Sequence, residues 1–356
     1  MKKVLMMLCA VALLAMTACK KDDPTETVTP SGGNGGGGNG GTEQPEQVPQ
    51  GEGIFSPSQK IDTIMIDGQV SEEWTWTDRK LSLIDKQDGY SEFQYSGWQV
   101  TGMTTIVEGS PVDVAYRYLN NKLSSVDAYS GTMRAVSINF NHNHPAGKIS
   151  DMSLDINSTL LDLLSDFLGS DSIFNFFSSA SKESSKFAID TTVFNAFLTW
   201  QGDNVSRMIL DGSITMKVTV GEARQVFPNF DTLLAAVASF LTDTNLKITL
   251  TIADTSIYTY DTLNNPFYGF LGALDVTTLS ANNVTSLLAS GVAKLASITV
   301  EVLFNPVTIT QFPASIPTSI ALPSRNMTYI YTYNNEGFPV TVTNSDGSVK
   351  QYIYKQ

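Results

Sequence analysis

The chain has 356 residues, with 22 basic and 35 acidic side chains and a formal net charge of −13. An acidic surface repels a phosphate backbone, so this charge argues against nucleic acid as a partner. It also argues against a generally basic surface as the means of attachment to an anionic membrane.

Residues 1–18 have the pattern of a secretory leader. Lys2 and Lys3 form a short positive start, and residues 4–16 form an apolar run too short to span a bilayer. The small residues before Cys19 resemble the motif of bacterial lipoproteins, in which the leader is cut at the cysteine and its thiol is acylated, for example with palmitate. The alternative is an ordinary signal peptide with a chance cysteine. Loss of the leader changes the net charge from −13 to −15 and leaves one cysteine, hence no disulfide.

A short charged run follows the cysteine: Lys20, Lys21, Asp22 and Asp23. It resembles the signal that directs Bacteroidota lipoproteins to the outer face of the outer membrane, with a generic polar spacer as the alternative. Residues 19–50 are poor in large apolar side chains and contain the run SGGNGGGGNGG, which is typical of flexible coil. They are predicted to form a lipidated tether with an average reach of roughly 30 Å.

Residues 51–356 are predicted to form one large β-rich domain of hairpins. Apolar and aromatic residues recur two apart, which places both members of a pair on one strand face, as in Trp74/Trp76, Phe93/Tyr95, Tyr116/Tyr118, Ile138/Phe140, Tyr331/Tyr333 and Tyr352/Tyr354. Turn residues follow at 78–79, 96–97, 120–121, 141–147, 334–337 and 345–347. The pattern indicates a curved antiparallel meander sheet.

Helical patterns are predicted at 158–168, 229–241 and 283–295, each with an apolar stripe and none long enough to span a bilayer. We expect three or four such amphipathic helices to pack on one face of the sheet. The predicted fold class is therefore mainly β, of the α+β type, with helical insertions in a single domain.

Two stretches resemble a known family. IYTYDTLNNPFYGFLGALD (257–275) and the aromatic hairpin YTYNNEGFPV (331–340) are similar to a family of uncharacterised Bacteroidota surface lipoproteins, a domain of unknown function. In that family an Asn-Pro-Phe segment introduces a short helix, and hairpins like those of tyrosine-aspartate repeat proteins form the sheet. Asn265, Pro266 and Phe267 match the first element, and the resemblance covers about 51–354. It implies no catalytic residue.

Groups that carry chemistry are few. The two histidines, His142 and His144, stand in FNHNHPAGK and can bind a metal only if a carboxylate such as Asp151 approaches. A solvated turn is the favoured interpretation. No Gly-x-Ser-x-Gly sequence supplies a nucleophilic serine, while a hydrolytic carboxylate pair stays an open alternative. We predict no catalytic residue, no metal and no cofactor.

The tryptophans Trp74, Trp76 and Trp98, with Tyr95, have two interpretations. They form either a platform on which a sugar ring stacks or, as we favour, the core face of a half-buried sheet. Asp-Thr and Asp-Ser pairs such as Asp62-Thr63 resemble O-glycosylation sites, and whether any carries a glycan is left open.

The sequence therefore predicts a non-catalytic binding or interaction module on an outer-membrane lipoprotein exposed at the cell surface. Its partners are the membrane, through the acyl anchor, and a glycan or a surface protein. The alternatives are a carrier of an apolar ligand between sheet and helices, and a carbohydrate-binding or carbohydrate-active protein.

Overall fold

The computed structural model describes residues 48–49, 51–107, 109–156, 188–219, 245–272, 275–300, 306–312, 318–322 and 324–355. Within these ranges the chain is almost entirely β-strand, with one short helix. The elements are β1 (Ile61–Ile66), β2 (Gln69–Thr77), β3 (Lys80–Lys86), β4 (Gly89–Ser96), β5 (Gln99–Val107), β6 (Ser110–Leu119), β7 (Lys122–Ser130), β8 (Met133–Asn141), β9 (Asp151–Ile156), β10 (Ala188–Gln201), β11 (Asn204–Thr219), β12 (Asn245–Asn264), α6 (Val276–Leu279), β13 (Asn282–Val300), β14 (Val307–Ile309), β15 (Ser319–Ala321), β16 (Arg325–Tyr333), β17 (Pro339–Asn344) and β18 (Val349–Tyr354).

The strands close into a 16-strand antiparallel barrel. Consecutive strands pair from β1 to β13, and β16 continues the ring through β17 to β18. β14, β15 and β16 all pair with β13, each with a different part of that strand. The ring closes where β18 pairs with β1, from Ile61 opposite Tyr354 to Ile66 opposite Lys350.

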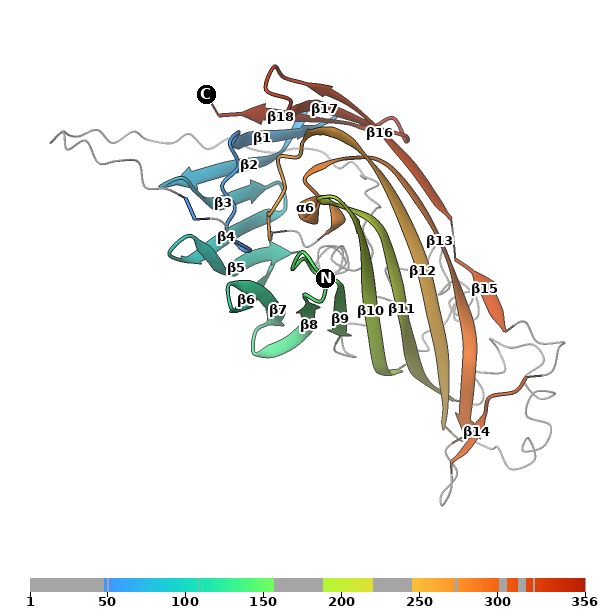
Figure 1. Cartoon of the computed structure of the whole chain (residues 1–356). Helices are drawn as coiled ribbons and strands as arrows, with labels where there is room; N and C mark the ends of the chain where they lie inside the picture. The colour runs from blue at the N-terminus through green and yellow to red at the C-terminus, as the bar shows by residue number, and fades with distance from the viewer. Residues whose placement is uncertain are drawn as a thin grey trace, which may run out of the picture.

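The barrel has a short wall and a tall wall, as Figure 1 shows. β1 to β9 contain 6 to 10 residues each, whereas β10 to β13 contain 14, 16, 20 and 19. At about 3.3 Å per residue, β12 is roughly 65 Å long and far exceeds the strands opposite it. The long strands pair over almost their whole lengths, so the tall wall is one continuous curved sheet.

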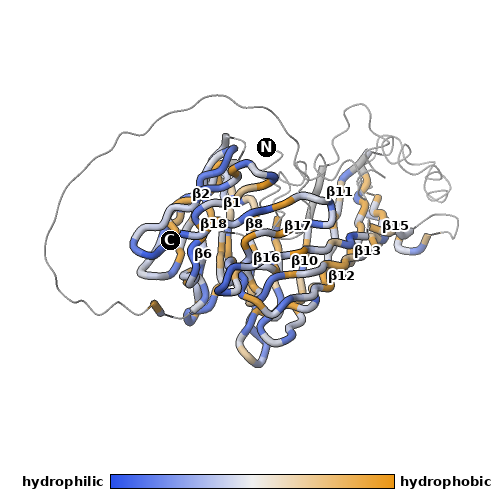
Figure 2. Tube along the Cα trace, turned by 90° about the horizontal axis from the view of Figure 1, so that it is seen from above, coloured by the Kyte–Doolittle hydropathy of each residue, from blue (hydrophilic) through white to orange (hydrophobic). Residues whose placement is uncertain are grey.

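Most apolar residues of the strands face into the barrel, and the outer face is mainly polar, with exposed apolar exceptions such as Phe197, Ile257 and Ile330. On β12 the inward residues Leu246, Ile248, Leu250 and Ile252 are 0 to 9 % exposed. The residues between them point outward: Lys247, Thr249, Thr251 and Ala253. This alternation of polar and apolar residues along the strands can be followed in Figure 2. It arises because successive side chains of a strand point to opposite faces of the sheet.

The predicted α+β fold is wrong. The helix expected at 283–295 is part of β13, where Leu287, Ala289, Ala293 and Leu295 are buried at the spacing of a strand. The apolar stripe that suggested a helix included Leu288, which is 52 % exposed on the outer face. The helices expected at 158–168 and 229–241 lie outside the described residues.

The apolar face of the sheet is buried by closure of the barrel and not, as the sequence predicted, by packed helices. No layer of helices covers one face of the described sheet; instead the sheet curls until its inward side chains enclose one another. The predicted turns account for much of the local geometry. Asp78-Arg79 and Asn120-Asn121 have positive φ at both positions, as tight hairpin turns require, whereas the turn expected at 96–97 lies at 97–98.

Candidate functional site

One end of the barrel is where the chain enters from residues 19–50. We call it the tether rim: it comprises the segment 51–60 before β1, the turns at 78–79, 97–98, 120–121 and 202–203, the loop 142–150, and Lys355 after β18. In an antiparallel ring, every second connection lies at the same end, so these turns from distant parts of the sequence become neighbours.

The tether rim is filled by two segments that pass inside the barrel. Phe55 lies 5.0 Å from Phe270 between ring centroids, and Phe270 lies 5.2 Å from Trp74. Backbone bonds fix the first segment, since Val100 N donates to Gly53 O at 2.9 Å. Gly53 has φ of 77° and a Cβ there would lie 2.1 Å from the Tyr118 hydroxyl, so only glycine fits.

The second segment contains the Asn-Pro-Phe sequence that carries the family resemblance. Asn265 donates from Nδ2 to Ser280 O at 2.8 Å, and its Oδ1 accepts from Phe267 N at 3.0 Å. The short helix α6 follows, with Asp275 as its N-cap. Tyr116 reaches across from β6 and donates to Leu271 O at 2.8 Å. These bonds hold the segment inside the rim, where Figure 1 shows α6 within the ring of strands.

The three tryptophans singled out from the sequence occupy different environments. Trp74 is 3 % exposed and belongs to the core, among Phe55, Phe267 and Phe270. Trp76 is half-buried beside it and donates from Nε1 to Ile61 O at 2.7 Å. Trp98 is half-buried in the turn between β4 and β5. The three rings therefore do not share one open surface.

Cations gather around the two outer tryptophans. Lys60 Nζ lies 5.3 Å from the ring centroid of Trp76. Arg79 Cζ and Lys80 Nζ lie 5.5 and 5.1 Å from the ring centroid of Trp98. Lys80 Nζ also lies 5.8 Å from the ring of Tyr95, whose pKa burial raises to about 12.

A fourth cation joins this group from the C-terminus. Lys355 N donates to Lys60 O at 2.8 Å, which places the last residues of the chain beside the segment before β1. We call Lys60, Arg79, Lys80 and Lys355, with Trp76 and Trp98, the basic rim cluster. Sequence analysis missed its four cations because they come from three segments that only barrel closure brings together.

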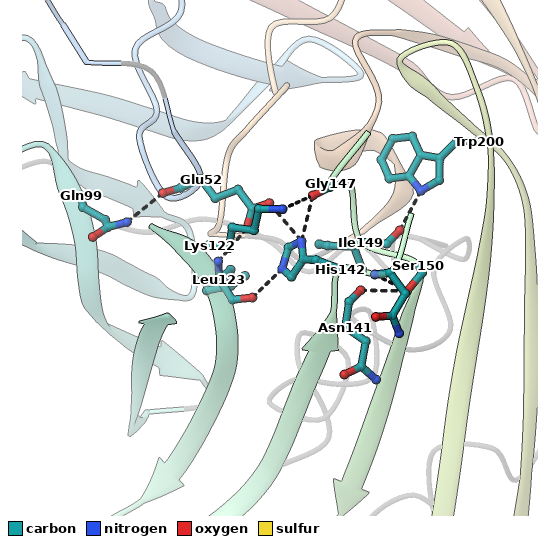
Figure 3. A network of polar contacts seen from close by, with 11 residues as sticks. Glu52, Gln99, Lys122, Leu123, Asn141, His142, Gly147, Ile149, Ser150 and Trp200 are labelled. Carbon is teal, nitrogen blue, oxygen red and sulfur yellow. Dashed lines mark hydrogen bonds and ion pairs between the residues drawn. The ribbon is translucent and has the colours of Figure 1, made fainter. Parts of the chain in front are cut away.

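The histidine region forms a structural network, shown in Figure 3. His142 Nε2 lies 2.9 Å from Leu123 O, and its Nδ1 lies 3.2 Å from Gly147 O and 3.4 Å from Glu52 Oε1. Glu52 in turn accepts from Leu123 N at 2.6 Å. The side chain of His142 is 13 % exposed, so the expectation of a fully solvated turn is wrong for this residue. It links the entering segment to β7 and to the loop 142–150.

The neighbouring His144 lies apart from that network. Its ring centroid is 6.5 Å from Trp200, over which Lys148 Nζ sits at 5.0 Å, and Trp200 donates to Ile149 O at 2.7 Å. Asp151, the carboxylate considered as a third metal ligand, instead accepts from Asn141 and Ser150. In the described ranges, no three residues of the types His, Cys, Asp and Glu are grouped so as to hold a metal ion.

An ion pair faces into the barrel from the tall wall. Arg325 donates to Asp254 at 2.6 Å, and their side chains are 15 and 8 % exposed. Burial raises the pKa of Asp254, and the charge of Arg325 and hydrogen bonds partly oppose the rise. The sequence signal was a charged residue on the apolar side of the β12 alternation, between Ile252 and Ser256.

The predicted lipidation and export residues, Cys19 and 20–23, lie outside the described residues. In the part of the chain that the structure describes, no helix has the length and apolar character needed to cross a membrane.

No protein-family model matches the chain, and no curated protein matches it. Among solved structures, the chain is similar to a porin-like protein from Bacteroides vulgatus ATCC 8482, with 9 % sequence identity and a TM-score of 0.35. The match covers 84 % of this chain and 99 % of that chain.

Proposed function

We propose that the protein is an outer-membrane lipoprotein, anchored through acylated Cys19 and exposed on the cell surface, whose barrel stands in water as a non-catalytic binding or interaction module. One observation carries the proposal: charged side chains on β11 interrupt the outer face of the tall wall, beside exposed apolar residues such as Phe197, Ile257 and Leu288. A barrel that crosses a membrane needs an apolar outer band about 25 Å tall.

The tall wall illustrates the conflict with membrane insertion. A membrane-crossing strand uses about 9 to 11 residues. Any ten consecutive residues of β11 include Asp211, and each such stretch also includes Arg207 or Lys217. All three are exposed on the outer face. A basic residue at the lipid-facing midplane costs roughly 2–4 kcal/mol, so this wall is suited to water.

Two further features support the same proposal. The tether rim is filled by the segments 51–56 and 265–281, whose aromatic residues pack against Trp74. The apolar interior also contrasts with the polar interior of a conducting barrel. Attachment to the membrane is then the task of the acyl group on Cys19, and the family resemblance to surface lipoproteins supports that assignment.

The test replaces residues 1–18 with a cleavable leader of a non-lipoprotein and changes Cys19 to Ser. We expect the exported chain to be soluble without detergent, because its only membrane attachment has been removed. The matched control keeps the native residues 1–18 and Cys19, and it should stay with the membranes. Recovery of the serine variant in the outer membrane, extractable only with detergent, would show that the barrel itself is inserted.

A further inference from the structure

The basic rim cluster concentrates positive charge in an otherwise acidic protein. Three cations, Lys60, Arg79 and Lys80, lie 5.1 to 5.5 Å from the ring centroids of Trp76 or Trp98. The fourth, Lys355, lies beside Lys60. The pKa of Lys60 is lowered, first by burial and then by the positive charges of Arg79 and Lys355. These cations therefore repel one another, and an anion placed among them would relieve the repulsion.

Two carboxylates near the basic rim cluster offset part of its positive charge. Asp62 lies 4.0 Å from Lys355 Nζ, and both side chains are substantially exposed, at 48 and 39 %. Asp78 shares the turn with Arg79. A solvent-exposed pair at this distance contributes little, so Asp62 only weakly offsets the charge of Lys355.

The position of the cluster identifies the source of those anions. The tether, residues 19–50, joins the barrel at this rim, and its 32 residues have an average reach of roughly 30 Å. The acylated end of the tether and the basic rim cluster therefore approach the same membrane. The turns at the opposite end of the short wall carry Asp67 and Asp88, and Asp346 lies in the turn between β17 and β18 at that end.

The composition of the cluster fits a lipid surface. Tryptophan and tyrosine prefer the boundary between headgroups and water, and lysine and arginine attract anionic headgroups. Half-buried Trp98 lies in an outermost turn with Arg79 and Lys80 over its ring. Its aromatic face and the two cations are thus presented together at the rim.

We propose that the basic rim cluster binds the phosphate groups of anionic lipid headgroups, so that the barrel docks with its tether rim on the membrane that holds its acyl anchor. The proposal rests on the proposed anchoring for its biological setting, but the surface itself can be tested without the anchor.

The experiment uses the mature chain with Cys19→Ser, which lacks the acyl group. Its affinity is measured by co-sedimentation with phosphatidylcholine vesicles containing phosphatidylglycerol and with vesicles of phosphatidylcholine alone. We expect binding to the anionic vesicles that weakens with added salt, and far weaker binding to the neutral ones. Equal affinity for the two vesicles, or no binding to the anionic ones, would overturn the proposal.

Two matched variants distinguish the effect of the basic rim cluster on vesicle binding from the effect of the net charge of the protein. Arg79→Glu with Lys80→Glu should weaken binding at least about 25-fold, since each basic residue near an anionic surface contributes roughly a five-fold factor. Arg207→Glu with Lys294→Glu makes the same charge change on the outer wall and should leave affinity within about two-fold. Equal losses in both variants would show that net charge alone matters, which would refute the cluster.

A second variant guards against a folding defect. Lys355→Glu lies after the last strand, is 39 % exposed, and should weaken vesicle binding at least about five-fold while the thermal midpoint stays unchanged. An unchanged affinity in this variant would count against the proposal. The vesicle assay uses a protein without the acyl group, so absence of vesicle binding would leave the anchoring proposal intact. The solubility test does not depend on the cluster, so its failure would leave the vesicle assay valid.

Discussion

Truncating Trp74 to alanine should destabilise the protein by removing a buried ring from the packing of the tether rim. The indole is 3 % exposed and lies 5.2 to 6.4 Å from the ring centroids of Phe55, Trp76, Phe267 and Phe270. Burying a tryptophan removes roughly 200 Å² from water, about 5 kcal/mol at 25 cal/mol per Å², and measured truncations cost about 3–5 kcal/mol. The change also removes the Nε1 donor to Glu72 Oε2, now at 2.9 Å.

Urea unfolding measures this loss directly. With a slope of roughly 3 kcal/mol per molar urea, a loss of about 4 kcal/mol lowers the midpoint by about 1.3 M. Trp98→Ala is the matched control: this half-buried ring lies in a turn, and we expect a loss below about 1 kcal/mol. A glycan array is screened with wild type and both variants. Unchanged midpoint for Trp74→Ala together with lost glycan binding would refute the core assignment and favour the sugar platform.

Three further predictions concern the ion pair, the histidines and the export signal. Arg325→Met should cost about 3–5 kcal/mol at neutral pH because it leaves Asp254 buried without its cation. Burial raises the pKa of Asp254 in the folded protein above its value in the unfolded chain. The contribution of this carboxyl group to stability is therefore fully present below the pKa of the unfolded chain, and it is lost as the pH rises through the pKa of the folded protein. The loss should thus be smaller in acid, and equal losses from urea midpoints at both pH values would contradict this reasoning. His142→Gln should lower stability by roughly 1–3 kcal/mol because the ring links Leu123 O to Gly147 O, whereas His144→Gln serves as a nearly neutral control. Neither variant should change metal content, and stoichiometric zinc lost on mutation would prove the metal-free assignment wrong. Replacing residues 20–23 with alanine should preserve acylation but leave the protein facing the periplasm, so protease added to intact cells should digest wild type and spare the variant; equal digestion would remove the export signal.

Local structure was predictable where the signal lies within one hairpin. The pair Trp74 and Trp76 does face the interior, and the turn Asp78-Arg79 forms as its residues suggested. Strand alternation and turn chemistry act between neighbours in sequence, so they can be read without knowing the rest of the fold.

Closure and the basic rim cluster were not predictable in that way. The pairing of β1 with β18 joins residues at the two ends of the domain, and no local pattern encodes it. Lys60 and Lys355 become neighbours only through this pairing, which also explains why the cluster was missed. At 283–295 two periodicities competed, and alanine, serine and glycine beside leucine made the strand pattern weak.

The seam between β1 and β18 has a consequence for how the protein is made. The ring cannot be completed until β18 has been synthesised, because Ile61 of β1 pairs with Tyr354 of that strand. Until then β1 and β17 each present an open edge, and pairings between such distant residues form slowly. Delayed closure is compatible with the proposed export, in which the chain crosses a membrane before it folds. A product that ends before β18, and so lacks residues 349–356, keeps both edges exposed. We expect it to aggregate edge to edge rather than to form a slightly weakened barrel.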